Sequence, residues 1–360
     1  MKPKLRIAFV GFGHVGRRFA DLLRGPFGRA LRTAGVTPAV TGIATARHGI
    51  AIAACGLSAT RAAALTGAGK PLAVLHRGPA VGSVAEFIRQ VPADVLVEIT
   101  TLDPRSGEPA TSHVAAALRR GLHVVTANKG PVAFARRRLR RLAARRGLVF
   151  LHEGAVMDGF PIFNLVERCL PGVQVLGFRG VVNATTTRIL SSMEKGVDFE
   201  AALREVQAAG VAEADPRHDI DGWDAAVKAC AIANALMNAE LRPKDVRRQG
   251  IAAITAADVA AAGARGERLR LVARGWREGR QVRLSVAPEA LPEGDLLGAR
   301  ADGALVLATD LMGEVGLSEG PGGVEQTAYA LLADLIEVTR ALRGRAGPLR
   351  PERRSGRASG

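Results

Sequence analysis

The sequence predicts an α/β protein, with a doubly wound parallel sheet in its first 150 residues and a second α/β domain after it. Three observations lead to this expectation. Short apolar strands alternate with helical segments along the first part of the chain. A glycine-rich turn follows the first strand at once and opens a helix. The length of 360 residues is enough for two domains, each with its own core.

The elements of the first domain follow one another in a regular order. Its first strand is expected at Leu5–Val10 (LRIAFV), and the helix after the glycine turn at Arg17–Arg24. Later strands are expected at Ala39–Ala44, Val95–Thr100, His123–Thr126 and Val149–His152, with helices at Ser83–Gln90 and Ser112–Arg120. The stretch from His48 to Arg77 is rich in Ala and Gly, and its composition indicates no definite element.

The glycine turn predicts a dinucleotide site. Its GxGxxG spacing is weak evidence alone, but a strand before it and a helix after it give the spacing a physical meaning. The glycines allow a tight turn and let a pyrophosphate reach the helix N-terminus. A glycine-rich turn without a ligand is the alternative. The expected cofactor-binding residues are Gly11, Phe12, Gly13, His14, Val15 and Gly16.

The choice of cofactor is predicted from a missing acid. A site selective for NAD offers a carboxylate at the end of the second strand, where it holds the ribose 2′-hydroxyl. Between Asp21 and Glu86 this chain contains no Asp or Glu. The second strand instead runs into Arg47, whose guanidinium suits a 2′-phosphate. We therefore expect NADP(H) to be preferred over NAD(H), with Thr45 or His48 assisting. A site that accepts either cofactor, or an Arg47 that stacks on adenine, is the alternative.

A block of charge lies between residues 210 and 228. Its segment Trp223–Glu240 is expected to be a helix, with Asp219 or Asp221 as its N-cap and with Pro216 keeping the preceding loop out of helix. Residues four apart share a helix face, so an acid and a lysine of this block meet. A solvated ion pair beside a helix cap is the alternative. The concentration of charge predicts a polar site formed by Glu213, Asp219, Asp224 and Lys228.

Composition narrows the class of protein. A hydrophobic content of 48% with 23% charged residues is typical of a globular chain. No apolar run approaches the ~20 residues of a membrane helix, and glycines interrupt any signal-peptide core at the N-terminus. The three cysteines lie far apart, which suits a reducing cytoplasm. We expect a cytoplasmic protein with no membrane partner.

The net charge of +16 comes largely from two segments. Residues 131–147 hold seven arginines and no acid, and predict an amphipathic surface helix with Val132, Leu139 and Leu142 inward and the arginines outward. Residues 343–360 are rich in Arg, Gly, Pro and Ser, and predict a basic disordered tail. Neither segment carries a signature of nucleic-acid recognition, so no specific nucleic-acid partner is expected.

Taken together, these features resemble the homoserine dehydrogenase family, in the short form without a C-terminal regulatory domain. The combination of TANKGP with the acid and lysine block is specific, whereas the glycine turn alone is not. The matching segments span most of residues 1–340: the glycine turn, Thr126–Pro131 (TANKGP), His152–Val156 (HEGAV), the E-x5-D-x4-D-x3-K spacing that ends at Lys228, and Gly320–Gly323 before a helix at Thr327–Leu342.

The resemblance implies an enzyme of threonine and methionine biosynthesis that interconverts L-homoserine and L-aspartate 4-semialdehyde with a nicotinamide cofactor. It also implies a homodimer. The implied catalytic residues are Lys228 as general acid or base, Asp224 beside it, and Lys129 at the junction of cofactor and substrate. The implied substrate-binding residues are Glu213 and Asp219 at the amino end, with Asn183, Thr185 and Thr186 on the pocket wall. Thr100 and Gly322 join the cofactor site.

A monovalent cation site, for Na⁺ or K⁺, is also implied by the resemblance. Its ligands would be Glu153 and Val156, together with the backbone carbonyls of Asp158 and Phe160. A second carboxylate at Asp158 departs from the family pattern. It could alter ion affinity, or the segment could serve another purpose. A loop with a salt-bridged Glu153 is the alternative to a cation site.

A second departure lies at residues 181–190 (VVNATTTRIL), where Ala184, Thr187 and Arg188 do not match the family. Arg188 could face solvent or reach an anionic group of the substrate. Two alternatives to the main function therefore stay open. One is an NADP-dependent reductase of another small amino or oxo acid. The other is a non-enzymatic protein that binds nucleotides or polyanions.

Three regions are expected along the chain. Residues 1–150 would form the dinucleotide-binding domain, completed by 318–342. Residues 151–317 would form the catalytic and dimerisation domain, with strands at Val175–Asn183 and Arg280–Val286. The tail would follow from residue 343.

Overall fold

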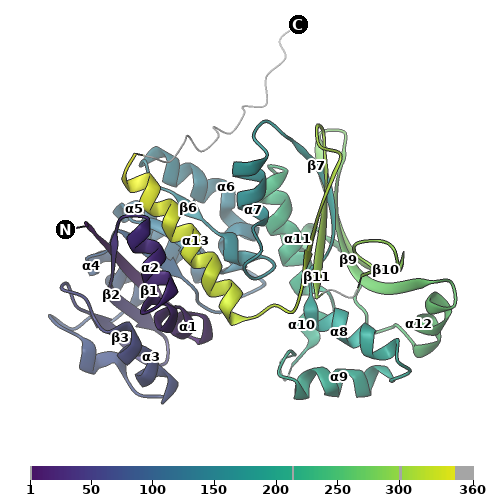
Figure 1. Ribbon diagram of the computed structural model, residues 1–360, viewed down its shortest axis with the longest axis horizontal. Helices are drawn as coiled ribbons and strands as arrows, with labels where there is room; N and C mark the ends of the chain where they lie inside the picture. The colour runs from purple at the N-terminus through teal and green to yellow at the C-terminus, as the bar shows by residue number, and fades with distance from the viewer. Residues whose placement is uncertain (1, 213–214, 300–301, 345–360) are drawn as a thin grey trace, which may run out of the picture.

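The computed structural model describes residues 2–212, 215–299 and 302–344 (Figure 1). Two six-stranded sheets organise the chain, with the strand orders β3-β2-β1-β4-β5-β6 and β12-β11-β7-β9-β10-β8. The expected α/β class is confirmed. Strands of the first sheet end by residue 151 and those of the second begin at residue 175, and between these points we propose the domain boundary.

The first sheet is parallel except at one edge. Its parallel strands are β1 (Lys4–Val10), β2 (Thr37–Thr45), β4 (Val95–Glu98), β5 (His123–Thr126) and β6 (Phe150–Leu151). The edge strand β3 (Gly49–Ile52) pairs antiparallel with β2, because only a three-residue turn joins the two and a parallel partner needs a long crossover. The Ala/Gly-rich stretch with no definite prediction therefore holds β3, α3 (Ala59–Gly67) and η1 (Leu72–Leu75).

Helices cover both faces of this sheet. Alternate residues of β1 show the two faces: Ile7 and Phe9 belong to one core, and Ala8 and Val10 to another. The first face carries α1 (His14–Leu23), α2 (Pro26–Thr33), α3 and α13 (Val324–Leu342), and the second carries α4 (Val84–Gln90), α5 (Ala110–Arg120) and α6 (Lys129–Arg145). Figure 1 shows α13, the last helix of the described chain, lying along α1 and α2.

The second sheet is antiparallel apart from one short pairing. Its strands are β7 (Val175–Val181), β8 (Arg247–Arg248), β9 (Glu267–Glu278), β10 (Gln281–Pro292), β11 (Gly303–Thr309) and β12 (Glu314–Glu319), of which β8 and β10 are parallel. The accompanying helices are η2 (Glu153–Ala155), α7 (Ile162–Asn164), η3 (Leu165–Cys169), α8 (Ala184–Met193), α9 (Phe199–Ala208), α10 (Arg217–Ile220), α11 (Trp223–Leu236), η4 (Pro243–Asp245) and α12 (Ala256–Gly263).

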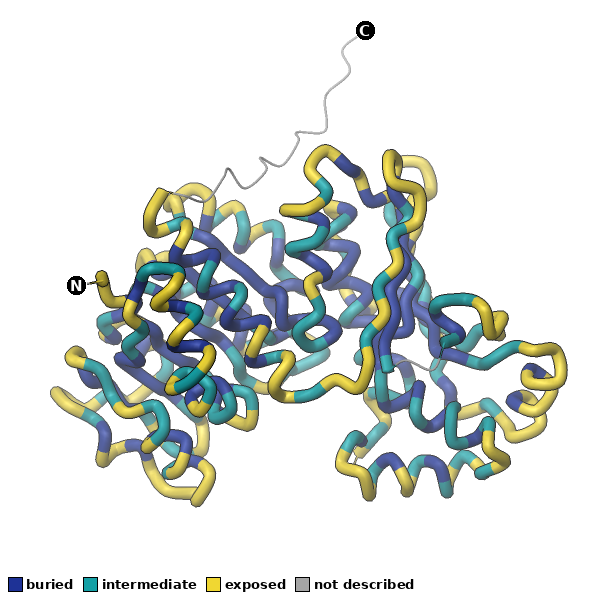
Figure 2. Tube along the Cα trace, viewed as in Figure 1, coloured by how far each residue is buried: buried dark blue, intermediate teal, exposed yellow. Residues whose placement is uncertain are grey.

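Helix α11 joins the two halves of the molecule. It packs on α6 on one side and on β9 and β10 on the other, so its middle is buried around its whole circumference (Figure 2). Small residues allow this close packing. The Asn234 amide donates to the carbonyls of Ala133 and Leu241, which ties α11 to α6 and to the chain after the helix. The last turn of α11 is therefore tied to α6, and the buried middle of the helix lies between α6 and the second sheet.

The structure corrects three details of the predicted helices. Arg136 in α6 points inward rather than outward, with 3% of its surface exposed. Its guanidinium donates to His152, to the Asn234 carbonyl and to Glu167, so the buried charge is compensated. The N-cap of α11 is Gly222, with a φ of +78°, rather than Asp219 or Asp221. Asp219 lies in α10, because the chain after Pro216 forms a short helical turn before α11 begins.

Candidate active site

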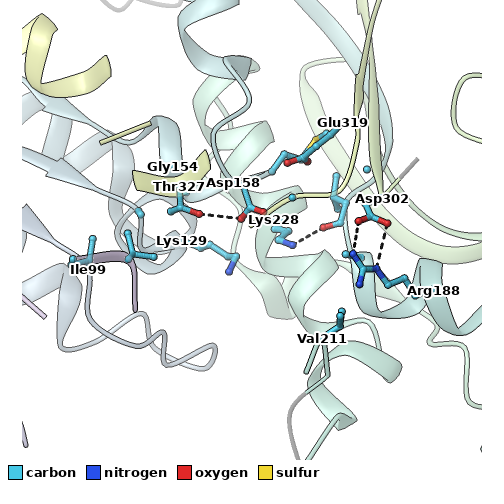
Figure 3. Close-up of a pocket in the computed structure, with 18 of the residues that line it drawn as sticks. Ile99, Lys129, Gly154, Asp158, Arg188, Val211, Lys228, Asp302, Glu319 and Thr327 are labelled. Atoms are coloured by element: carbon cyan, nitrogen blue, oxygen red, sulfur yellow. Dashed lines mark hydrogen bonds and ion pairs between the residues drawn. The ribbon is translucent and has the colours of Figure 1, made fainter. Parts of the chain in front are cut away.

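A cleft of about 500 Å³ lies where the first sheet, α11 and the chain returning to α13 meet (Figure 3). Ile99, Thr100 and Ala127, which follow strands of the first sheet, line it together with Gly303 and Glu319 of the second sheet. Of the residues predicted from sequence, Val15, Thr100, Lys129, Asp158, Lys228 and Gly322 lie on its wall. The glycine turn, the TANKGP segment and Lys228 of α11 therefore meet at the cleft. In the sequence, Val15 and Lys228 are 213 positions apart.

Asp224 is the centre of charge at this cleft. Its carboxylate lies 2.8 Å from the Lys228 ammonium and 3.5 Å from that of Lys129. The Lys228 ammonium also donates to the Val182 carbonyl at 2.6 Å. The Asn183 amide donates to Asp224 at 2.9 Å. Two lysines from different helices thus share one carboxylate, which fixes both ammonium groups at the edge of the cleft.

Opposing effects set the ionisation of this pair. Burial would raise the pKa of Asp224, but the charges of Lys228 and Lys129 outweigh it, and the pKa is lowered. Burial would likewise lower the pKa of Lys228, but the Asp224 charge and hydrogen bond outweigh it, and the pKa is raised above 10.5. At neutral pH both groups are charged. The Lys228 ammonium is therefore a proton donor held in a fixed place.

Asp219 and Asn183 lie directly behind the Asp224–Lys228 pair. Asn183 is the N-cap of α8 and donates to Asp219 at 2.7 Å. Burial, followed by the Asp224 charge, raises the pKa of Asp219. Thr185 and Thr186 are buried in the first turn of α8, where the Thr186 hydroxyl donates to the Asn183 carbonyl. Glu213, the other predicted acid, lies outside the described residues.

The position of Lys129 depends on a network of buried polar groups at the ends of β4 and β5. Thr126 donates to the Glu98 carbonyl at 2.8 Å, and the Asn128 amide donates to the Thr100 carbonyl at 2.9 Å. The Asn128 side chain then accepts from the Gly130 N–H at 2.8 Å and caps α6. Because α6 begins at Lys129, this cap determines where the lysine enters the cleft.

The three glycines of the turn have three different environments. Gly11 has a φ of +88°, and an added Cβ would lie 2.5 Å from the Ile99 carbonyl oxygen. At Gly16 an added Cβ would lie 2.9 Å from the Phe12 ring, so this glycine allows α1 to pack closely. At Gly13 an added Cβ would meet no described atom within 4 Å. The open side of Gly13, at the N-terminus of α1, fits the approach of a pyrophosphate.

The end of β2 lies beside the glycine turn, because the Gly11 N–H donates to the Ala44 carbonyl at 2.9 Å. Arg47 is exposed in the turn that follows. Thr45 is occupied by this turn, since its hydroxyl accepts from the His48 N–H and donates to the Gly49 carbonyl. Among the three predicted cofactor contacts here, Arg47 is therefore the side chain best placed to extend toward a ligand.

The predicted cation ligand Glu153 is buried, with 3% of its surface exposed. Its two oxygens accept from the Phe163 and Asn164 N–H groups at 2.9 and 2.8 Å, which caps α7. Burial raises the pKa of Glu153 to about 7. Carboxylate oxygens have further lone pairs, and a carboxylate with backbone carbonyls is a hard-oxygen set that suits Na⁺ or K⁺. The residues fit such an ion, and the site stays a prediction.

The tertiary structure adds charged residues that the sequence analysis did not select. Asp302 and Glu319 line the cleft. Arg188, one of the departures from the family pattern, forms an ion pair with Asp302 at 2.6 Å on the cleft wall, and so it neither faces solvent alone nor lacks a partner (Figure 3). Thr327, at the start of α13, also lines the cleft. No local motif marks these positions, because they come from α8, β12, α13 and the chain before β11, which meet only in the folded chain.

Comparisons with known proteins agree on one family. A family model for homoserine dehydrogenase matches residues 161–336, and a model for its NAD-binding domain matches residues 11–153. The chain is 36% identical to an NAD(+)-dependent homoserine dehydrogenase of Pseudomonas canavaninivorans, over 92% of this chain and 96% of that one. A crystal structure of homoserine dehydrogenase from Thiobacillus denitrificans superimposes with a TM-score of 0.80, at 28% identity, over 97% of this chain and 77% of that one. A hyperthermophilic archaeal homoserine dehydrogenase in complex with NADPH gives a TM-score of 0.78, at 28% identity, over 96% and 100% of the two chains.

Proposed function

The chain belongs to the homoserine dehydrogenase family, and on that basis we propose that it interconverts L-homoserine and L-aspartate 4-semialdehyde with NADP(H) in preference to NAD(H). It is an oxidoreductase of this family, so the alternative of a non-enzymatic binding protein is set aside. The observation that carries the proposal is the Asp224–Lys228 pair. It lies beside Lys129, and Lys228 lines the same cleft as Val15 of the glycine turn.

Each residue has a distinct task in the proposed reaction. The nicotinamide cofactor supplies the hydride, so the protein orients the reactants and manages charge. Reduction of the aldehyde places negative charge on its oxygen, and the Lys228 ammonium stabilises and protonates that oxygen. In the reverse direction, neutral Lys228 accepts the proton of the hydroxyl. Asp224 orients both lysines, and Lys129 adds a second positive charge at the junction of cofactor and substrate.

Substrate and cation binding complete the proposal. We assign Glu213 and Asp219 to the amino end of the substrate, because a carboxylate suits an ammonium group. Asn183, Thr185 and Thr186 are buried behind them, while the neighbouring Val182 and Ala184 line the cleft itself. Thr100, Gly322 and the glycine turn hold the cofactor. A sodium or potassium ion at Glu153, with the carbonyls of residues 156, 158 and 160, would stabilise the loop that carries part of the cleft.

Lys228→Ala tests the proposed mechanism. The variant should lower kcat by orders of magnitude, while NADPH binding, measured by fluorescence titration, stays close to the wild-type value. Cofactor binding is preserved because the side chain contacts Asp224 and the Val182 carbonyl rather than the glycine turn. Substantial turnover by the variant would contradict the assigned role.

The preference for NADP(H) rests on Arg47 and on the lack of an acid at the end of β2. The named relatives do not share one cofactor, since one is called NAD(+)-dependent and another is a complex with NADPH. The ratio of kcat/KM for NADPH to that for NADH decides between them. Arg47→Ser should lower this ratio by about tenfold or more, because a charge-assisted contact is lost. A wild-type preference for NADH would show that the proposal is wrong.

A second candidate is oxidation or reduction of another small amino or oxo acid, which the Arg188–Asp302 pair in the cleft favours. A panel of amino and hydroxy acids beside L-homoserine tests it directly. Family membership also supports a homodimer and a role in threonine and methionine biosynthesis. Light scattering tests the first, and growth of a homoserine-requiring strain that carries this chain tests the second.

A further inference from the structure

Asp158 has an unusual backbone. It has a φ of +47°, and the preceding Met157 has a φ of +51°, so both residues lie in the left-handed region. Non-glycine residues adopt this region at a cost, and they keep it only when packing holds them there. Here Gly159 packs on the start of α13 so closely that an added Cβ would lie 2.2 Å from the Gln326 carbonyl oxygen. The turn that carries Asp158 is thus clamped against α13.

The carboxylate of Asp158 is held in one place on the cleft wall. One oxygen accepts from the Thr327 hydroxyl at 3.3 Å. The other lies against Gly322, where an added Cβ would come within 2.4 Å of it. Asp158 and Lys228 line the same cleft. Figure 3 shows Asp158 beside Lys228 and directed into the space between the elements.

Asp158 and Glu319 are the acids on the cleft wall that form no ion pair within the described residues, and burial raises the pKa of Glu319 to about 7, which leaves Asp158 as the stronger anion. Asp224 is paired with Lys228 and Lys129, and Asp302 is paired with Arg188. Within the described parts of the chain, no lysine or arginine forms an ion pair with Asp158. A carboxylate offers about four acceptor positions. The Thr327 hydroxyl uses one of them, so acceptor capacity remains on the side that lines the cleft.

The substrate of the proposed reaction carries one positive charge, its α-ammonium. Resting on that proposed function, we propose that Asp158 is a further substrate-orienting residue, whose carboxylate binds the α-ammonium and thereby directs the hydroxyl-bearing end toward Lys228. The family resemblance gave this position only a backbone carbonyl. The side chain adds a recognition element that suits amino acids over simple hydroxy acids, because an ammonium group forms an ion pair with the carboxylate in addition to a hydrogen bond.

Asp158→Asn tests this inference, because it removes the charge but keeps the size of the side chain. Two substrates are compared: L-homoserine, and 4-hydroxybutyrate, which lacks the amino group. For homoserine, kcat/KM should fall by about tenfold or more, mainly through KM. For 4-hydroxybutyrate, kcat/KM should change by less than about twofold. If this compound binds only as an inhibitor, its Ki should change by less than about twofold. Thr327→Val should give a smaller loss in the same direction.

Controls separate binding of the ammonium from effects on the fold. Asp158→Gly should show the same selectivity, and its fold is favoured because glycine adopts positive φ readily. Glu314 is an exposed acid on the same strand as Glu319, and Glu314→Gln should leave kcat/KM unchanged for both substrates. The KM for the cofactor should stay constant in all these variants.

Two results for Asp158→Asn would overturn the inference: an equal loss with both substrates, or no loss with homoserine. An equal loss would mean that Asp158 acts through Lys228 or the fold. If wild-type protein fails to oxidise homoserine at all, the proposed function falls instead, so the two failures are distinguishable.

Discussion

Asp224→Asn is the substitution that tests the electrostatics of the cleft most directly. It keeps the shape of the side chain but removes the charge 2.8 Å from the Lys228 ammonium. At an effective dielectric constant of about 20, two unit charges at that separation attract each other by roughly 6 kcal/mol. The two side chains are only 15% and 17% exposed, so solvent screens this attraction weakly. Burial offsets part of it, and it is the Asp224 charge that keeps the pKa of Lys228 above 10.5.

The sign of the expected change follows from these opposing effects. In the oxidation of homoserine, neutral Lys228 is the active form, so kcat rises as the pH approaches the pKa of Lys228. Without Asp224, burial acts with less opposition and lowers this pKa, because it disfavours the charged ammonium. The rising limb of kcat against pH should therefore move to lower pH.

The assay follows cofactor reduction by absorbance across the pH range, with homoserine saturating so that kcat reports the enzyme–substrate complex. Asp221→Asn is the matched control, because that aspartate precedes α11 but forms no ion pair within the described residues. Its profile should coincide with the wild type. A rising limb that stays in place in Asp224→Asn would refute the reasoning, whatever happens to the height of the plateau.

Two further predictions concern cofactor binding and the core. Gly13→Ala should weaken cofactor binding by about tenfold or more at a nearly unchanged Tm, because the added methyl fills the open approach to the turn. Gly11→Ala should lower both the cofactor affinity and the Tm, because its φ is +88° and its Cβ would clash with Ile99. Calorimetry measures the Tm and titration measures cofactor binding, and equal behaviour of the two variants would contradict this assignment. Arg136→Met should lower the free energy of unfolding by about 1–3 kcal/mol, because it removes the buried donor to the Asn234 carbonyl and to His152, while Glu167 keeps its ion pair with Arg140. Exposed Arg138→Met should change it by less than about 0.5 kcal/mol in the same chemical denaturation, and similar losses in both would argue against the burial effect.

The local pattern of residues was sufficient to predict much of the fold. Strand β5 at His123–Thr126 lies where its apolar run indicated, and α4 begins immediately after Ser83, whose hydroxyl caps it. Periodicity and capping act within a few residues, so the sequence alone carries them. The same reasoning failed at Arg136, because its charge is compensated by Glu167 and the Asn234 carbonyl, which lie 31 and 98 residues away in the chain.

The candidate site divides in the same way. The sequence by itself determined the glycine turn, the TANKGP segment and the Asp224–Lys228 spacing, because each is a local arrangement with its own chemistry. Only the tertiary structure decided what surrounds them. It pairs Arg188 with Asp302 and sets the Asp158 carboxylate against Thr327 and Gly322. The contacts of Asp158 depend on the chain's return to the first sheet through α13, and the Arg188–Asp302 pair joins α8 to a residue that is 114 positions later in the chain. Charges that neutralise or orient one another across such distances leave no periodicity in the sequence, and so the balance of charge in the cleft emerges only when the two sheets are brought together.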